Sequence, residues 1–198
     1  MSYWCPKPKG TTSDIYSKRS VLTQIMAVKY HLNWDNIKKR LETHPDEAAE
    51  KDKFGVTALH HVIRKHSKNK HTSTTGRISH NNNDGNTDGG DDGVPMEIFR
   101  LLIEECPDSL NLCDRMTGCN ALHLACSTLR SGIDAGDGSG KKQYSGDNKM
   151  KDVIMMILEK RHESAMKLDI DGRLPLHRCK DVDVVRKLID IYPEGVRV

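Results

Sequence analysis

The clearest metal-binding pattern in this sequence lies between residues 84 and 92. Segment 84–89 has the sequence Asp-Gly-Asn-Thr-Asp-Gly, so oxygen-bearing side chains alternate before a glycine, and Asp92 follows. That spacing is typical of the first half of a calcium-binding loop. The position at which such a loop needs a bidentate glutamate holds Pro95 instead, and the nearest glutamate is Glu97. The loop is incomplete, and a calcium-responsive regulatory module stays open as an alternative function.

The cysteines, glycine-rich segments and serines offer no comparable site. Four of the six cysteines lie between Cys106 and Cys126, with six, five and six residues between them, whereas zinc sites begin with closely spaced ligand pairs. Segment 136–141 ends in Gly-Lys but lacks the spacing of a phosphate-binding loop and a preceding strand. No serine stands in a nucleophile-elbow sequence. We therefore expect no enzymatic activity, no catalytic residue, no cofactor and no metal ion.

Histidine is the other residue type that could bind a metal ion or act in catalysis, and it recurs in one sequence pattern. His60, His123 and His177 each follow a leucine, and each Leu-His pair follows an aspartate and a glycine. The three stretches are Asp52–His60, Asp114–His123 and Asp169–His177. Each is predicted to be a turn followed by the first residues of a helix, with the glycine where the turn needs positive φ. A repeated unit of this kind predicts a stacked array rather than one closed core.

The repeat continues outside these stretches in a single register. Four anchor residues each have an apolar residue eight and four positions before them and an acidic residue three positions before them. The anchors are Pro45, Pro107, His162 and Pro193, and the apolar pairs are Ile37 and Leu41, Phe99 and Ile103, Ile154 and Leu158, and Val185 and Ile189. Apolar residues four apart lie on one face of a helix, so the acidic neighbour is expected in solvent.

These residues resemble the ankyrin repeat family, whose signature is an Asp and a Gly in a β-turn, followed by Thr-Pro-Leu-His at the start of the first of two helices. The resemblance covers about residues 20–198 apart from two insertions. It implies an all-α, ankyrin-like helical-repeat solenoid of about four units with short β-turn or hairpin connections. In the family the motif histidine ties adjacent repeats together through hydrogen bonds to neighbouring backbone. The motif residues carried over are Gly55, Thr57, Leu59, His60, Gly118, Leu122, His123, Gly172, Leu176 and His177.

Departures from the signature predict local differences between the units. Thr57 is expected to cap free amides of the helix that follows it. Asn120 stands in its place in the second motif and can also cap, whereas Leu174 in the third cannot, so the third motif helix should start more weakly. Segment 114–118 is one residue longer than segment 52–55, so its tip is expected to bulge.

The four anchor residues are unevenly spaced, and this spacing predicts where insertions interrupt the repeat. The family period is about 33 residues, and the first two units exceed it. We place the extra residues at about 67–93 and 130–149, between the two helices of a unit, and predict both insertions to be disordered. Residues 1–19 are predicted to be a flexible basic tail and 20–198 an ankyrin-repeat domain. Because the array stops within a unit, a fragment of a larger multidomain scaffold is a further alternative.

The resemblance implies a protein–protein interaction module, an adaptor or scaffold that binds through turn tips and the inner-helix face. The tips carry apolar side chains among basic ones, a mixture that suits a protein partner with an acidic rim. The candidate partner-binding residues are Lys53, Phe54, Arg115, Met116, Ile170, Asp171 and Arg173. The alternative, that some of these apolar side chains merely pack on neighbouring hairpins, stays open.

Composition and charge indicate whether nucleic acid or a membrane is an expected partner. The net charge is only +3, and the basic strip 64–80 contains no Phe, Trp or Tyr for base stacking, so we expect no nucleic-acid partner. No apolar run is long enough to span a membrane, and no signal peptide is visible, so we expect no membrane partner. We expect a monomer with reduced cysteines inside the cell, in the cytoplasm or, alternatively, the nucleus.

Overall fold

The computed structural model describes residues 20–26, 33–72, 94–129 and 145–197, and over these ranges the chain is all-α. The α-helices are α2 (Val21–Met26), α3 (Trp34–Thr43), α4 (Ala58–Thr72), α5 (Met96–Glu105), α6 (Ala121–Thr128), α7 (Ser145–Lys160), α8 (Pro175–Arg178) and α9 (Val182–Ile191). The 3-10 helices in the same ranges are η1 (Pro45–Ala49), η2 (Pro107–Asn111), η4 (His162–Met166) and η5 (Pro193–Arg197). An isolated antiparallel bridge pairs Lys51 with Thr57.

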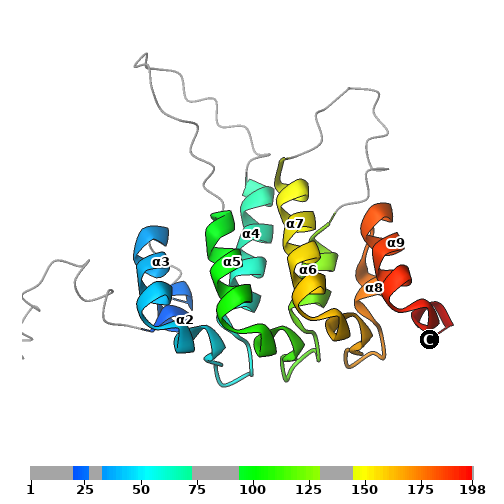
Figure 1. The fold of residues 1–198 in the computed structure, drawn as a ribbon, viewed down its shortest axis with the longest axis horizontal. Coiled ribbons are helices and arrows are strands. Elements are labelled where there is room, and N and C mark those ends of the chain that lie inside the picture. Colours follow the sequence, from blue (N-terminus) through cyan, green and yellow to red (C-terminus); the bar gives the residue numbers. More distant parts are fainter. Residues whose placement is uncertain (1–19, 27–32, 73–93, 130–144, 198) are drawn as a thin grey trace, which may run out of the picture.

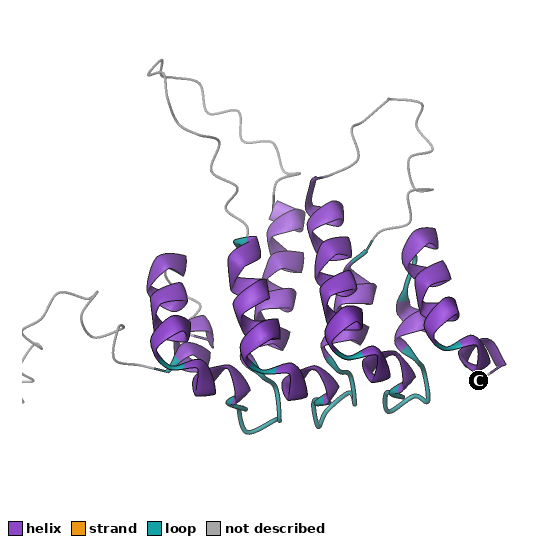
Figure 2. Ribbon diagram, viewed as in Figure 1, coloured by secondary structure: helices purple, strands orange, loops and turns teal. Residues whose placement is uncertain are grey.

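The helices stand in two rows (Figure 1). Helices α3, α5, α7 and α9 form the front row of that view, and α2, α4, α6 and α8 lie behind them. Neighbours within a row pack together: α3 with α5, α5 with α7, α4 with α6 and α6 with α8. A 3-10 helix follows each front-row helix, and after η1, η2 and η4 a loop leads to the next back-row helix, so these loops gather at one edge (Figure 2). The described chain thus repeats one helix–helix–turn arrangement.

Apolar stripes on α5 and α7 build much of the core between the rows. The buried residues of these stripes are Ile98, Phe99, Leu102 and Ile103 in α5, and Val153, Ile154, Ile157 and Leu158 in α7. Both sets have the spacing of one helix face, and the acidic residue beside the stripe, Glu104 or Glu159, is exposed as expected. Each fully buried side chain of this size contributes about 1.5–3 kcal/mol to folding, so these stripes hold the rows together.

A buried glutamate ties the first elements to one another. Glu47 of η1 accepts hydrogen bonds from the guanidinium of Arg40 in α3 and, at 2.9 Å, from the backbone N–H of Val21 in α2. The hydrogen bond from Arg40 is the main reason why the pKa of the Glu47 carboxyl is lowered, although burial opposes the change. Because an unpaired buried carboxylate would be costly, α2, α3 and η1 are held in one arrangement.

The structure differs from the sequence prediction at the edges of the two insertions. Residues 67–72, predicted to be disordered, continue helix α4, and residues 145–149, predicted likewise, begin helix α7. Both helices have buried apolar residues that anchor them in the core, and extending a formed helix costs little per residue. The rest of both insertions, the predicted tail 1–19 and the candidate calcium segment 84–92 lie outside the described residues.

Replacing Glu47 with glutamine should lower the free energy of unfolding by about 1–3 kcal/mol, because the amide loses the charge-assisted bonds to Arg40. Because the pKa of Glu47 is lowered in the folded protein, its ionised carboxylate stabilises the fold at pH values above the ordinary pKa of 4.5. This stabilisation is lost as the pH falls through the pKa of Glu47 in the folded state. Urea titrations at several pH values measure both effects. Glu42→Gln makes the same charge change at an exposed position and should leave the midpoint unchanged. An unchanged midpoint for Glu47→Gln would contradict the assigned role.

Candidate functional site

Three turns lie side by side at the edge where the loops gather (Figure 2). They span residues 52–56, 114–119 and 169–173, and each leads from a 3-10 helix toward a back-row helix. In the first turn, the N–H of Asp52 donates to the Val56 carbonyl at 3.0 Å, and the N–H of Gly55 donates to the Asp52 carbonyl at 2.9 Å. The third turn repeats both bonds. The second turn contains one more residue within the same hydrogen-bonded frame, which is the bulge predicted for its tip.

Each turn contains a glycine with positive φ, as predicted: 78° at Gly55, 66° at Gly118 and 72° at Gly172. The space beside the three glycines differs. A Cβ on Gly118 would lie 2.7 Å from the backbone nitrogen of Ile170 in the third turn, whereas a Cβ on Gly172 would meet nothing within 4 Å. On Gly55 it would lie 3.4 Å from the Arg115 side chain. The second glycine therefore also permits a close approach between two turns.

Each turn opens with an aspartate whose carboxylate folds back onto the backbone. One oxygen of Asp52 accepts the N–H of Phe54 at 2.8 Å and the N–H of Val56 at 2.9 Å, and Asp114 and Asp169 likewise accept two amides each. Burial alone would raise the pKa of these carboxyls, but their hydrogen-bond donors outweigh it, and the pKa of each is lowered. The aspartates are ionised acceptors that fix the shape of the turns.

The second oxygen of each aspartate meets a basic side chain that the sequence analysis did not select. His61 Nε2 lies 3.3 Å from the first aspartate, and Arg178 donates to the third at 2.8 Å. Both residues directly follow a motif histidine, which is the signal that could have identified them. The second motif has Leu124 there, and Arg64 of the preceding helix α4 donates to that aspartate at 3.2 Å instead. No local pattern indicated this contact, since it joins two units.

Backbone hydrogen bonds join each turn to the next. The N–H of Arg115 donates to the Phe54 carbonyl at 2.8 Å, and the N–H of Ile170 donates to the Thr117 carbonyl at 3.0 Å. Both bonds start at the residue after a turn aspartate and end at the residue before a turn glycine. The three turns therefore form one hydrogen-bonded row rather than three independent loops.

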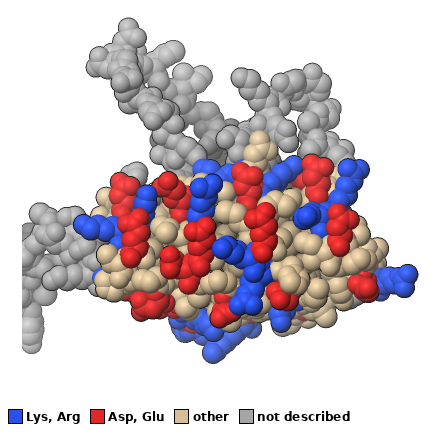
Figure 3. Space-filling model, viewed as in Figure 1, with Lys and Arg blue, Asp and Glu red and all other residues tan. Residues whose placement is uncertain are grey.

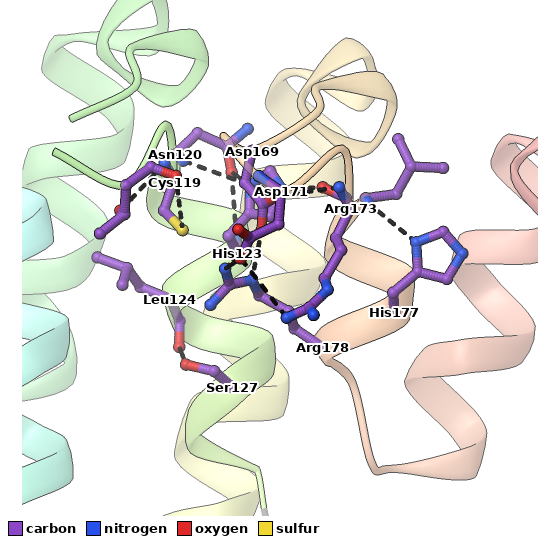
Figure 4. A network of polar contacts seen from close by, with 12 residues as sticks. Cys119, Asn120, His123, Leu124, Ser127, Asp169, Asp171, Arg173, His177 and Arg178 are labelled. Atoms are coloured by element: carbon purple, nitrogen blue, oxygen red, sulfur yellow. Dashed lines mark hydrogen bonds and ion pairs between the residues drawn. The ribbon is translucent and has the colours of Figure 1, made fainter. Parts of the chain in front are cut away.

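The motif histidines add a second link between units. His60 is fully buried, and its Nε2 lies 3.3 Å from the Cys119 carbonyl beyond the next turn glycine. His123 in α6 makes the same link to the Arg173 carbonyl at 3.0 Å (Figure 4). Because a carbonyl only accepts, Nε2 carries the proton in both rings. Thr57 was expected to cap a helix amide, but its hydroxyl lies 2.8 Å from Nδ1 of His60, where it satisfies the buried ring nitrogen.

The second and third motifs differ in how their helices start. Asn120 accepts the N–H of His123 at 3.0 Å and so caps α6, as expected. Leu174 supplies no such side-chain bond, and α8 has only four residues, in line with the weaker start expected there. His177 accepts the N–H of Leu174 at 3.0 Å through Nδ1 (Figure 4). Unlike the other two motif histidines, His177 is exposed.

The side chains at the tips of the turns project into solvent. Phe54 is 42% exposed, Met116 67% and Ile170 71%, so Met116 and Ile170 are not buried against neighbouring turns. The Nζ atom of Lys53 lies 4.9 Å from the centre of the Phe54 ring. Figure 3 shows basic side chains protruding at the edge where the turns lie. We define the tip surface as the exposed residues Lys53, Phe54, Arg115, Met116, Ile170, Asp171 and Arg173. All seven predicted partner-binding residues thus lie along one row of turns.

The described ranges contain neither a cluster of metal ligands nor a membrane-spanning helix. There, no three His, Cys, Asp or Glu side chains are close enough together to hold a metal ion. None of the helices in those ranges combines the length and apolar character needed to cross a membrane. Comparisons of the chain with protein-family models, with curated proteins and with solved structures found no match.

The buried histidine of the first unit should make stability depend on pH. Burial lowers the pKa of His60 from its ordinary value of 6.5 to about 4, against the opposing hydrogen bond to the Cys119 carbonyl. The unfolded chain therefore binds a proton that the folded chain excludes, and the free energy of unfolding should fall as the pH drops from 6.5 toward about 4. The full effect is about 3 kcal/mol.

Urea titrations across this pH range measure the decline, to which His123 also contributes because burial lowers its pKa. His60→Gln should be less stable than the wild type near neutral pH and should lose part of the decline. His177→Gln changes an exposed histidine and should keep the decline in full. A decline of the same size in His60→Gln would contradict this assignment.

Alanine substitutions should separate the two roles of the turn glycines. Gly172→Ala should cost about 1–2 kcal/mol of unfolding free energy, because only the positive φ opposes the new side chain. Gly118→Ala should cost clearly more, because its Cβ would also press on the Ile170 backbone and disturb the bond between the turns. Equal midpoints for the two variants in thermal or urea unfolding would show that the close approach contributes nothing.

Proposed function

We propose that this protein is an ankyrin-like helical-repeat solenoid that binds another protein through its tip surface. The observation that carries this proposal is the row of turns, which is fixed by backbone bonds from Arg115 to Phe54 and from Ile170 to Thr117 and still leaves apolar tips open. The arrangement is that of a scaffold whose repeats present a surface, and it supports a binding role rather than a chemical one.

A rigid row of turns favours binding because the turns lose little conformational entropy when a partner binds. Association costs free energy for each loop and side chain that must be ordered, and these turns are ordered already by their aspartates, glycines and inter-turn bonds. The aspartate carboxylates hydrogen-bond the backbone of their own turns, and the two buried histidines hydrogen-bond the next unit. The proposal therefore assigns them to positioning, and it includes no catalytic residue, cofactor or metal ion.

The tip surface indicates the chemistry of the partner. Met116 and Ile170 are exposed apolar side chains at neighbouring tips, and the Phe54 ring lies in the same row. Apolar anchors surrounded by charge are typical of the centre and rim of a protein interface. Lys53, Arg115 and Arg173 provide positive charge around the anchors, so the proposed partner presents an apolar patch with an acidic rim. We propose that the module acts as a monomeric adaptor inside the cell.

The double variant Phe54→Asp, Met116→Asp should lose partner binding while the fold persists. Both side chains lie at tips, so acidic replacements would remove the apolar anchors and repel an acidic partner rim. Partners would be captured from a cell extract with the purified wild-type chain, identified by mass spectrometry, and titrated by calorimetry. The dissociation constant should rise at least about 100-fold, which corresponds to about 2.7 kcal/mol.

The matched control is Val182→Asp, Val196→Asp, which makes the same kind of change at two exposed apolar residues outside the row of turns. It should bind the partner like the wild type, and far-ultraviolet circular dichroism should show the same helix content for all three proteins. If the tip variant keeps wild-type affinity, or if the control loses as much as the tip variant, the tip surface is not the binding site.

A further inference from the structure

Two cysteines meet where the back-row helices α6 and α8 pack together (Figure 1). Cys126 lies on α6 and is completely buried, and Cys179 is the residue that ends α8. Cys179 packs against the same apolar core but keeps part of its surface in solvent. Each thiol is the largest single influence on the pKa of the other, so the two side chains are neighbours in the core where the units pack together.

The surroundings give the two sulfurs different characters. The thiol of Cys179 lies 3.7 Å from the Asp181 carbonyl, and Lys151, which pairs with the Asp181 carboxylate at 2.7 Å, places a positive charge nearby. Interaction with the Cys126 thiol is the main reason why the pKa of Cys179 is lowered, whereas the pKa of Cys126 is raised by the same interaction and by burial. Cys179 is therefore the thiol that ionises and meets a reagent from solvent first.

We propose that Cys126 and Cys179 form a dithiol site that a hydroperoxide oxidises to a reversible disulfide between α6 and α8. The Cys179 thiolate attacks the peroxide, its sulfur takes up the hydroxyl group as a sulfenic acid, and the other peroxide oxygen leaves as water or an alcohol. The Cys126 sulfur then attacks the sulfenic sulfur, the S–S bond forms, and a second water leaves. Two thiols lose two electrons and two protons, and the peroxide takes up both.

The other described cysteines do not share this arrangement. Cys113 directly precedes the second turn and Cys119 is its last residue, but each thiol is directed to a backbone carbonyl of its own segment, that of Asn111 or Thr117, at 3.8 Å. Burial raises the pKa of Cys113, which makes its thiolate scarcer. This neighbouring pair is therefore the natural internal comparison for the proposed site.

The disulfide would change how the third motif is held. Helix α8 has four residues and lacks a side-chain cap, so its position depends on packing against α6. A covalent bond from Cys179 to Cys126 would tie this short helix to a completely buried residue of the preceding unit. Because a disulfide restricts the unfolded chain, oxidation should raise the urea midpoint of unfolding, and reduction should restore the original value.

Hydrogen peroxide treatment of the full chain, followed by alkylation and peptide mapping without reductant, tests the proposal. We expect a peptide pair linking Cys126 to Cys179, lighter by two hydrogen atoms than the reduced pair and lost after dithiothreitol. In Cys126→Ala, dimedone should trap a sulfenic acid on Cys179. In Cys179→Ala, the buried Cys126 should stay a thiol. Cys106→Ala is the control and should form the same disulfide as the wild type.

Three results would overturn the proposal. The first is that Cys126 and Cys179 stay reduced at peroxide levels that oxidise the other cysteines. The second is that Cys113 and Cys119 become linked before them. The third is that oxidation of the wild type in concentrated urea yields the same single linkage as in buffer, because the folded contact would then not direct it. The last comparison needs no variant, so it remains decisive if a cysteine substitution prevents folding.

Discussion

The backbone hydrogen bonds between consecutive turns are the contacts on which the rest of the structure depends. Each turn offers a carbonyl on one side and an N–H on the other, and the bonds from Arg115 to Phe54 and from Ile170 to Thr117 join these groups in one register. That register places the carbonyls of Cys119 and Arg173 within reach of the motif histidines. Each turn leads directly into a back-row helix, so the register of the turns also sets the spacing of these helices, and the core lies between the two rows.

The features that the sequence predicted well are those with strict local requirements. A turn of this shape needs positive φ, and glycine meets that need with no steric cost, so Gly55, Gly118 and Gly172 marked the turns correctly. The extra residue of segment 114–118 predicted its bulge, because a fixed frame of hydrogen bonds must accommodate it. The acidic residues beside the apolar stripes were correctly expected in solvent, because helix periodicity alone places them there.

The features that the sequence did not reveal depend on residues that are distant along the chain. The contact of Glu47 with the backbone of Val21 needs α2 and η1 to be in place, and neither residue is unusual in its own segment. The bond from Arg64 to the second turn replaces one that Leu124 cannot make, so it exists only because two units are stacked. The insertions were predicted to be disordered from their composition, which underestimates how far an anchored helix extends into polar residues.

The unequal space beside the turn glycines determines which substitutions each of the three motifs tolerates during evolution. At Gly118 a single added carbon would meet the backbone of the following turn, so almost any mutation there would be selected against. At Gly172 there is room, and an asparagine, which tolerates the left-handed conformation, would be accepted more readily. Over evolutionary time the middle motif should therefore keep its signature longest, while the third could lose its glycine and still fold. Motif searches would then recognise such a chain mainly by its central unit.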